Sequence, residues 1–186
     1  MDSKKIEDGF RLILEGIGEN PNRDGLLKTP SRIAKMYAEV FSSLEDNSNE
    51  ESILSTQFIE KYDEMILLKD IPVTSFCEHH FLPFSGKAHV AYIPGNRIVG
   101  LSKLARTVEF YAARPQVQER LTTQIAELIY RTLEPRGVGV VLECVHSCVT
   151  IRGVKKHASV MFTSKLLGTF KSNATTRTEF LSLIGK

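Results

Sequence analysis

Apolar residues recur at helical spacing in two segments near the N-terminus. Within residues 4–18 they fall mostly at intervals of three and four, and the segment "GENPNRDG", with Pro21 and two glycines, then interrupts them. A second helix is predicted to begin at Thr29 and Pro30, with Thr29 as the N-cap and Pro30 in the first helical position. The acidic, polar segment 42–52 is typical of a loop or linker. The pattern therefore predicts an N-terminal helical region and a separate second domain, at residues 1–60 and 61–186.

Beyond residue 63 the pattern changes to runs of β-branched residues separated by two amphipathic helices. Strands are predicted at residues 64–76, at 86–100 with a turn at Pro94–Asn96, at 138–153 and at 158–167. Helices are predicted at residues 102–113, 115–137 and 176–185. Because strands and helices come in pairs and do not alternate, the order favours an α+β fold with mostly antiparallel strand pairing over a doubly wound sheet.

Composition narrows the class of protein. The net charge of +2 over 186 residues is small, and no basic stripe with interleaved aromatic residues is present, so nucleic acid binding is not expected. No apolar run approaches the roughly 20 residues that span a bilayer, and the charged N-terminus does not resemble a secretory signal. We therefore expect a cytoplasmic protein without a membrane partner. An odd number of cysteines, three, favours metal binding or catalysis over disulfides.

The segment "SFCEHHFLP" brings a thiol and two imidazoles together. Cys77 and His80 have the C-x-x-H spacing, which on a helical turn puts both side chains within reach of one ion. His79 is adjacent and should point elsewhere. A core cysteine beside two surface histidines is the plainer alternative for this segment alone.

A second segment, "CVHSCVTIRG", offers the remaining thiols. If residues 140–152 form one strand, alternate side chains share a face, which would carry Cys144, His146, Cys148, Thr150 and Arg152. Simple packing of small cysteines would not explain a histidine and an arginine there. Cys77, His80 and either strand cysteine would give three protein ligands, a number that suits zinc (Zn²⁺) with an open fourth position. The free imidazoles of His79 and His146 could then carry protons, which suggests metal-assisted hydrolysis.

Two further segments suggest an anionic purine or pterin ligand. Ser102 is a fair N-cap, and Lys103 and Arg106 follow on one side of the first turns, where cations make sense if an anion docks. Two solvated surface cations would be the plainer interpretation. Near the start of the next helix, Gln118 precedes Glu119, whose carboxylate matches the adjacent N–H and NH₂ donors of a guanine or pterin edge. A glutamate is also favoured at a helix start on electrostatic grounds alone.

Taken in order, these segments resemble the GTP cyclohydrolase I family. The resemblance runs from "GENPNRDGLLKTPSRIAKMYAEVF" through "CEHHFLPFSGKAHVAYIPG", "GLSKLARTVEFYAARPQVQERLT" and "HSCVTIRG" to "TSKLLGTF" and covers nearly the whole chain after the first dozen residues. It implies the tunnelling fold, an antiparallel sheet with two helices on one face, preceded by N-terminal helices. It also implies a homo-oligomer, usually a decamer, with active sites between subunits. A feedback regulatory protein is a further candidate partner.

The resemblance assigns roles to the candidate residues. It implies Cys77, His80 and Cys148 as zinc ligands, His146 as the proton donor to the purine imidazole ring and His79 as a second acid–base residue. Glu119 would anchor the guanine edge with Gln118 beside it. The remaining polar residues would hold the triphosphate and ribose: Ser102, Lys103, Arg106 and Arg152. The implied reaction opens the imidazole ring of GTP at C8, releases formate and rearranges the ribose to give 7,8-dihydroneopterin triphosphate.

Two rival functions remain at this stage. A tunnelling-fold enzyme of different chemistry, such as a nitrile reductase with a cysteine nucleophile, would not need the pairing of "CEHH" with "HSC". A structural zinc module would need a fourth ligand and would leave two histidines without a role. The chain also departs from the family pattern as we expect it, at Cys144, His157 and Met161.

Overall fold

The computed structural model of the chain describes residues 1–45 and 50–186, and it divides the chain into two compact units, Met1–Asn47 and Ser48–Lys186. Part of the linker expected at residues 42–52 lies outside the described residues; the rest contains two short 3₁₀ helices, Ser42–Leu44 and Glu50–Leu54. A domain boundary at residue 60 stays a prediction.

The first unit consists of two helices, α1 (Ser3–Gly16) and α2 (Thr29–Val40). The Asp2 carboxylate caps α1 by accepting a hydrogen bond from the Lys5 backbone N–H at 3.0 Å. The expectation that Thr29 caps α2 is wrong, because Thr29 is already helical and Lys28 occupies the cap position. Pro30 still lies in the first turn, where its missing N–H costs no helical hydrogen bond.

A five-stranded sheet forms the second unit, in the order β5–β2–β3–β6–β7. Four strands pair antiparallel, and only the short β5 runs parallel to its neighbour β2, so the predicted α+β class is confirmed. A separate two-stranded ladder pairs β1 with β4, and the predicted turn near Gly95 joins β3 to β4. The strands are β1 Gln57–Ile59, β2 Ile66–Cys77, β3 Pro83–Ile93, β4 Arg97–Val99, β5 Pro115–Gln116, β6 Gly137–His146 and β7 Met161–Gly168.

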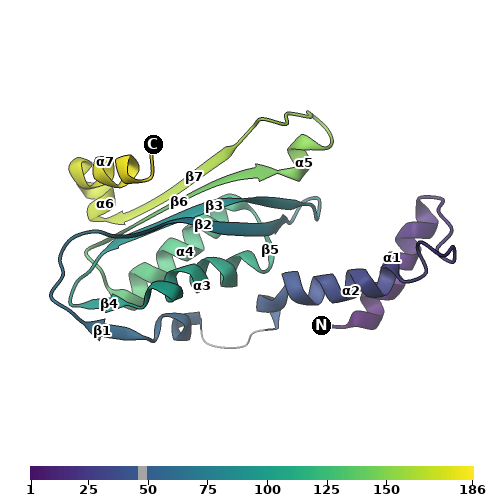
Figure 1. Ribbon diagram of the computed structural model, residues 1–186, viewed down its shortest axis with the longest axis horizontal. Coiled ribbons are helices and arrows are strands. Elements are labelled where there is room, and N and C mark those ends of the chain that lie inside the picture. Colours follow the sequence, from purple (N-terminus) through teal and green to yellow (C-terminus); the bar gives the residue numbers. More distant parts are fainter. Residues whose placement is uncertain (46–49) are drawn as a thin grey trace. The chain divides into compact units, whose positions relative to one another are not determined.

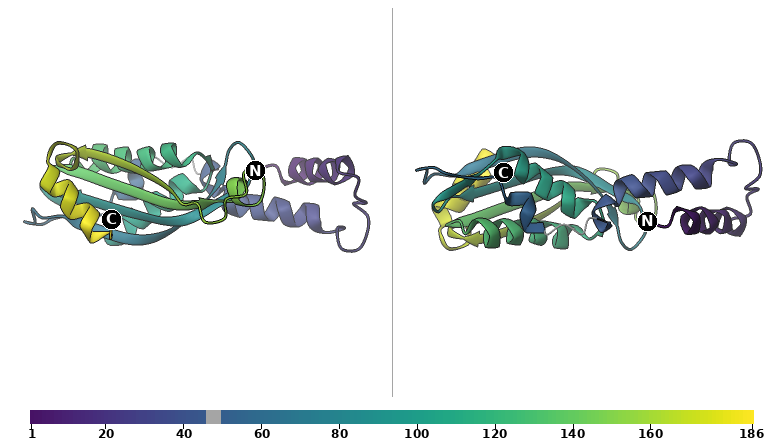
Figure 2. Two further views of the ribbon diagram at one scale, coloured as in Figure 1. Left: turned by 90° about the horizontal axis from the view of Figure 1, so that it is seen from above. Right: turned by 90° about the horizontal axis from the view of Figure 1, so that it is seen from below.

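Two helices, α3 (Leu101–Ala112) and α4 (Gln118–Leu133), cover one face of this sheet (Figures 1 and 2). Alternation along β6 sends Val140, Leu142 and Cys144 into the core beneath α3 and α4. The opposite face carries a smaller core around the C-terminal helices α6 (Thr169–Ser172) and α7 (Ala174–Leu183), where Phe170 and Phe180 meet edge to face. Among the described residues, no helix combines the length and apolar character needed to cross a membrane.

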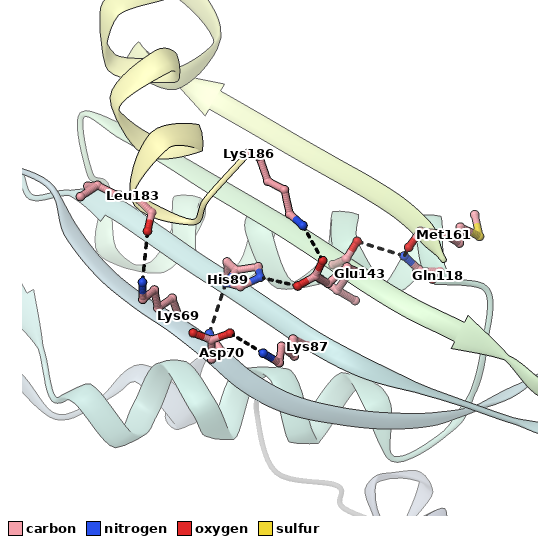
Figure 3. A network of polar contacts seen from close by, with 10 residues as sticks. Lys69, Asp70, Lys87, His89, Gln118, Glu143, Met161, Leu183 and Lys186 are labelled. Carbon is pink, nitrogen blue, oxygen red and sulfur yellow. Dashed lines mark hydrogen bonds and ion pairs between the residues drawn. The ribbon is translucent and has the colours of Figure 1, made fainter. Parts of the chain in front are cut away.

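A polar network on the face of α6 and α7 stabilises an irregularity in β2 (Figure 3). The β2–β3 register shifts at Asp70, which has a φ of 58°, and its backbone N–H donates to His89 Nδ1 at 3.2 Å. His89 Nε2 lies 3.4 Å from a Glu143 carboxylate oxygen, and the other oxygen accepts from Lys186 Nζ at 2.8 Å. The buried His89 thus satisfies a backbone group that the bulge removes from the ladder.

Gly86 leaves no room for a side chain between β3 and β6, and we expect Gly86→Ala to destabilise the fold. A Cβ at this position would lie 2.7 Å from Cys144 Cα and would also meet the Glu143 backbone oxygen. Since backbone atoms cannot give way as a flexible side chain can, we expect a loss of about 3 kcal/mol in the free energy of unfolding, measured by urea denaturation. Gly100→Ala is the matched control, since its nearest atom would be 3.8 Å away, and it should change stability by about 1 kcal/mol or less. Equal stability of both variants would contradict this account.

Candidate metal centre and active site

The turn after β2 brings Cys77 and His80 together. Cys77 is the last residue of β2, and its carbonyl accepts a hydrogen bond from the Phe81 N–H at 2.8 Å, an interval of four residues. Its own N–H donates to the Leu82 carbonyl at 2.9 Å. The segment therefore makes one helix-like turn, as its C-x-x-H spacing predicts.

The second thiol comes from a helical turn and not from a strand. The expectation of one strand over residues 140–152 is wrong beyond His146, where β6 ends and α5 (Ser147–Thr150) begins. The partner strand explains this change, because His146 pairs with Phe84 and β3 begins one residue before Phe84. With no partner left, the backbone forms local bonds, and the Ile151 N–H donates to the Ser147 carbonyl at 3.0 Å.

These two turns bring together three potential metal ligands, Cys77, His80 and Cys148, which we call the metal-ligand group. One ligand atom from each of Cys77, His80 and Cys148 lies within 4.8 Å of the others. Cys77 is buried, Cys148 is half-buried and His80 is exposed, so the group is open to solvent on one side. Two sulfurs and one imidazole, with one open side, fit a catalytic zinc site with a free fourth position. Arg152 borders the group, with its Nη1 donating to His80 Nε2 at 2.7 Å.

Cys144 lies apart from this group. It is only 1% exposed and packs in the core beneath the helices. Burial, together with the nearby Glu143 carboxylate, raises the pKa of the Cys144 thiol to about 12. Burial also raises the pKa of Cys148, and the neighbouring Cys77 thiol adds to this effect. By its place in the metal-ligand group, Cys148 and not the core residue Cys144 is positioned to share an ion with Cys77, a choice that strand alternation left open.

His146 is held from two sides beside this group. Its ring stacks on Phe84, with centroids 4.5 Å apart and planes 9° from parallel. Its Nε2 atom lies 2.8 Å from Oε1 of Gln118, in the first turn of α4. Burial lowers the pKa of His146, while the charge of the exposed Glu119 acts in the opposite direction. A neutral imidazole is thus available at ordinary pH, and Glu119 lies close enough to influence it.

His79 projects from the turn on the solvent side, as its position next to a ligand predicts. Its side chain is 65% exposed, and its Nδ1 lies 3.8 Å from the Cys77 sulfur. The adjacent Glu78 accepts two hydrogen bonds from Arg120, at 2.5 and 3.1 Å, which fasten the turn to α4. These bonds from Arg120 lower the pKa of Glu78, so the carboxylate stays ionised at neutral pH.

The candidate cations of α3 lie toward the end of this helix that is away from the metal-ligand group. The C-terminal end of α3 is attached to β2 two residues before Cys77, where Ser75 Oγ donates to the Ala112 carbonyl at 2.7 Å. At 1.5 Å per residue, the candidate residues at the other end lie about 9 to 15 Å back along the helix axis. These are Ser102, Lys103 and Arg106. Ser102 is also not the cap that its sequence suggests, because Gly100 occupies that position.

Sequence reasoning missed the contacts that hold His146. Phe84 was not a candidate, and nothing in its sequence context marks it. Gln118 was a candidate only as a neighbour of Glu119, yet it lies on the buried face of α4 with Leu121, Thr122 and Ile125. A polar residue in that helical register is the signal that could have identified it. Of the departures from the family pattern, His157 is exposed and Met161 pairs with Cys144 at the start of β7.

Known proteins resemble this chain over nearly its full length. Residues 6–185 match the family described as GTP cyclohydrolase I. "GTP cyclohydrolase 1" of Pelotomaculum thermopropionicum is 56% identical over 184 residues, 98% of this chain and 97% of that protein. The proteins of that name from Carboxydothermus hydrogenoformans and Bacillus subtilis are 55% and 54% identical, over 100% and 99% of this chain and 96% of each relative.

Among solved structures, the apo form of archaeosine synthase QueF-Like aligns with 58% of this chain and 97% of its own. The TM-score is 0.48 and the identity 18%, a similarity too weak to assign a fold. Family membership therefore depends on sequence, which matches over both units and across the segments that form the metal-ligand group. The chain belongs to the GTP cyclohydrolase I family, whose members are hydrolases.

Proposed function

We propose that this protein opens the imidazole ring of GTP by hydrolysis at C8, releases formate and forms 7,8-dihydroneopterin triphosphate. The observation that carries the proposal is the convergence of Cys77, His80 and Cys148 beside His146 in a chain of this family. We also propose that residues 61–186 form a tunnelling-fold catalytic domain, with residues 1–60 as a helical region before it. A cytoplasmic location stays a prediction.

The proposed metal is zinc, held by Cys77, His80 and Cys148. Two thiolates and one imidazole match the ligands that zinc takes in catalytic sites. When bound, zinc supplies Lewis-acid activation of water at neutral pH.

The protein's own residues bind the substrate and move protons. Ring opening requires a proton at the purine nitrogen, and we assign its delivery to His146, which the Phe84 ring holds in place. His79, on the solvent side of the turn, is the proposed second acid–base residue. The carboxylate of Glu119 is exposed near His146 and can accept hydrogen bonds from the guanine edge.

We propose that the triphosphate site is completed by a second copy of the chain. Arg152 lies at the metal-ligand group, whereas Lys103 and Arg106 lie on the distant part of α3. A homo-oligomer in which α3 of one subunit faces the metal-ligand group of another would bring all three cations to one phosphate chain. Ser102 would join them through its exposed hydroxyl. A decamer and a feedback regulatory protein stay predictions from the resemblance.

Incubation of the zinc-loaded protein with GTP tests the function directly. We expect one formate for each GTP consumed, with dihydroneopterin triphosphate identified by mass spectrometry. His146→Ala should keep its zinc but lose at least about 100-fold in turnover, the contribution usual for general acid–base catalysis. Zinc-loaded protein that leaves GTP unchanged would refute the proposal and favour a relative with another substrate.

Metal content separates the two candidate cysteines. We expect Cys148→Ser to lose stoichiometric zinc, because serine replaces a thiolate ligand with a weakly binding hydroxyl. Cys144→Ala is the matched control and should retain zinc, since its side chain packs in the core. Metal is measured by elemental analysis after dialysis against a weak chelator. Zinc retained by Cys148→Ser and lost by Cys144→Ala would overturn the ligand assignment.

Mixing two inactive variants tests whether sites form between chains. Cys148→Ser is expected to be inactive because it lacks the metal, and Lys103→Ala because it lacks a phosphate contact. If they are unfolded and refolded together, hetero-oligomers would contain some sites with both wild-type halves, and part of the GTP turnover should return. The same variants refolded separately and then combined are the control. Activity that fails to return in verified hetero-oligomers would place the whole site within one chain.

A further inference from the structure

Gln118 has a side-chain amide with a full set of partners deep in the protein. The residue is 1% exposed, and its Nε2 lies within hydrogen-bond distance of three acceptors. They are the Leu142 carbonyl at 3.2 Å, the Met161 carbonyl at 3.0 Å and the Thr163 hydroxyl at 3.0 Å. Figure 3 shows Gln118 and Met161 beside the sheet. The amide therefore joins α4 to both β6 and β7, and one atom remains for His146.

The partners of Gln118 determine which way its amide points. Two of the three acceptors near Nε2 are backbone carbonyls, which cannot donate a hydrogen bond. Rotating the amide by half a turn would place its oxygen against both carbonyls and leave buried groups unpaired. Oε1 must therefore face His146, at 2.8 Å from Nε2 of the ring.

Nearby hydroxyls reinforce this orientation. Thr122 Oγ1 donates to the Gln118 backbone carbonyl at 2.7 Å and lies 2.6 Å from Thr163 Oγ1. Since the Thr122 proton is used on that carbonyl, the Thr163 proton points to Thr122. The Thr163 oxygen is then left to accept from the Gln118 amide, which agrees with the orientation of the amide.

We propose that Gln118 is a positioning residue that holds His146 in the tautomer with its proton on Nε2. An amide oxygen can only accept, so the His146 Nε2 must donate, and the neutral ring then carries its lone pair on Nδ1. Nδ1 is accordingly the atom through which His146 exchanges a proton with the substrate. A proton taken up at Nδ1 from solvent gives the imidazolium that delivers it to the purine nitrogen, while Nε2 keeps its own proton in the hydrogen bond to Gln118 Oε1. This inference rests on the proposed role of His146 as proton donor.

Glu119, the next residue on α4, has a different role. Glu119 is exposed, whereas Gln118 points into the protein, so only Glu119 is free to contact a ligand. A buried carboxylate in place of Gln118 would face the same two carbonyls without a proton to offer them. A neutral amide is the group that can satisfy them and still accept from His146.

The tautomer can be observed without any substrate. We would label the histidine rings with ¹⁵N, load the protein with zinc and record solid-state NMR spectra, assigning His146 by the signals missing in His146→Asn. The expected result is a protonated Nε2 and an unprotonated Nδ1 for the neutral ring. A ring protonated on Nδ1 would overturn the inference.

Gln118→Met tests the consequence for catalysis, because methionine has a similar length and accepts hydrogen bonds only weakly. We expect a mixture of His146 tautomers and a fall in kcat of at least about 10-fold, a part of the 10²–10⁴-fold that acid–base catalysis supplies, with KM for GTP within about threefold. Thr122→Val is the matched control, since it disturbs the same network without touching the Gln118 amide. It should retain the tautomer and keep kcat within about threefold.

Other results of these experiments distinguish a wrong role for Gln118 from a wrong proposed function. A raised KM with unchanged kcat and tautomer in Gln118→Met would make Gln118 a substrate contact and overturn its positioning role. The tautomer is read in the wild-type protein and assigned with His146→Asn, so the measurement does not depend on Gln118→Met folding. An active enzyme with His146 protonated on Nδ1 would refute this inference alone, whereas an inactive wild type with Nε2 protonated would refute the proposed function alone.

Discussion

The pairing of β6 with β3 is the interaction on which the site depends. Its register places His146 opposite Phe84, so the imidazole stacks on an aromatic ring. The ladder ends almost immediately beyond this pair because β3 begins at Pro83. The chain then closes into the turn of α5 and brings Cys148 to Cys77. One register thus positions both an acid–base residue and a metal ligand, and a shift by one residue would send His146 to the other face.

Buried polar groups at the end of the sheet give the site its rigidity. A buried amide is costly unless each of its polar atoms has a partner, and all the polar atoms of the Gln118 side chain have one. The same applies to His89 on the other face, which fills the hydrogen-bonding gap at the β2 bulge. Each network joins elements far apart in sequence, so the strands that carry the site are held together by specific contacts as well as by the apolar core.

Several parts of the site could be predicted from sequence. The spacing of Cys77 and His80 is local, so a single turn decides their relation. The change from strand to turn after His146 could not be predicted, because Val149, Thr150 and Ile151 all favour strands. The strand ends because β3, its partner, begins at Pro83 and offers no residue to pair beyond His146. The role of Gln118 could not be predicted either, since the carbonyls that accept hydrogen bonds from its amide lie on β6 and β7.

The sequence by itself determined the α+β class, the two helices that cover the sheet, the C-x-x-H turn and, through long ordered motifs, the family. These depend on periodicity and short-range spacing, which the order of residues contains directly. Strand alternation left Cys144 or Cys148 as the partner of Cys77, and the resemblance implied Cys148; the tertiary structure groups Cys148 with Cys77 and packs Cys144 in the core. Only the tertiary structure decided that Gln118 faces inward. It also decided that Lys103 lies at the far end of α3 from the metal-ligand group. Each of these facts depends on which strands meet and where their pairing ends, because burial and hydrogen-bond satisfaction are settled between distant segments.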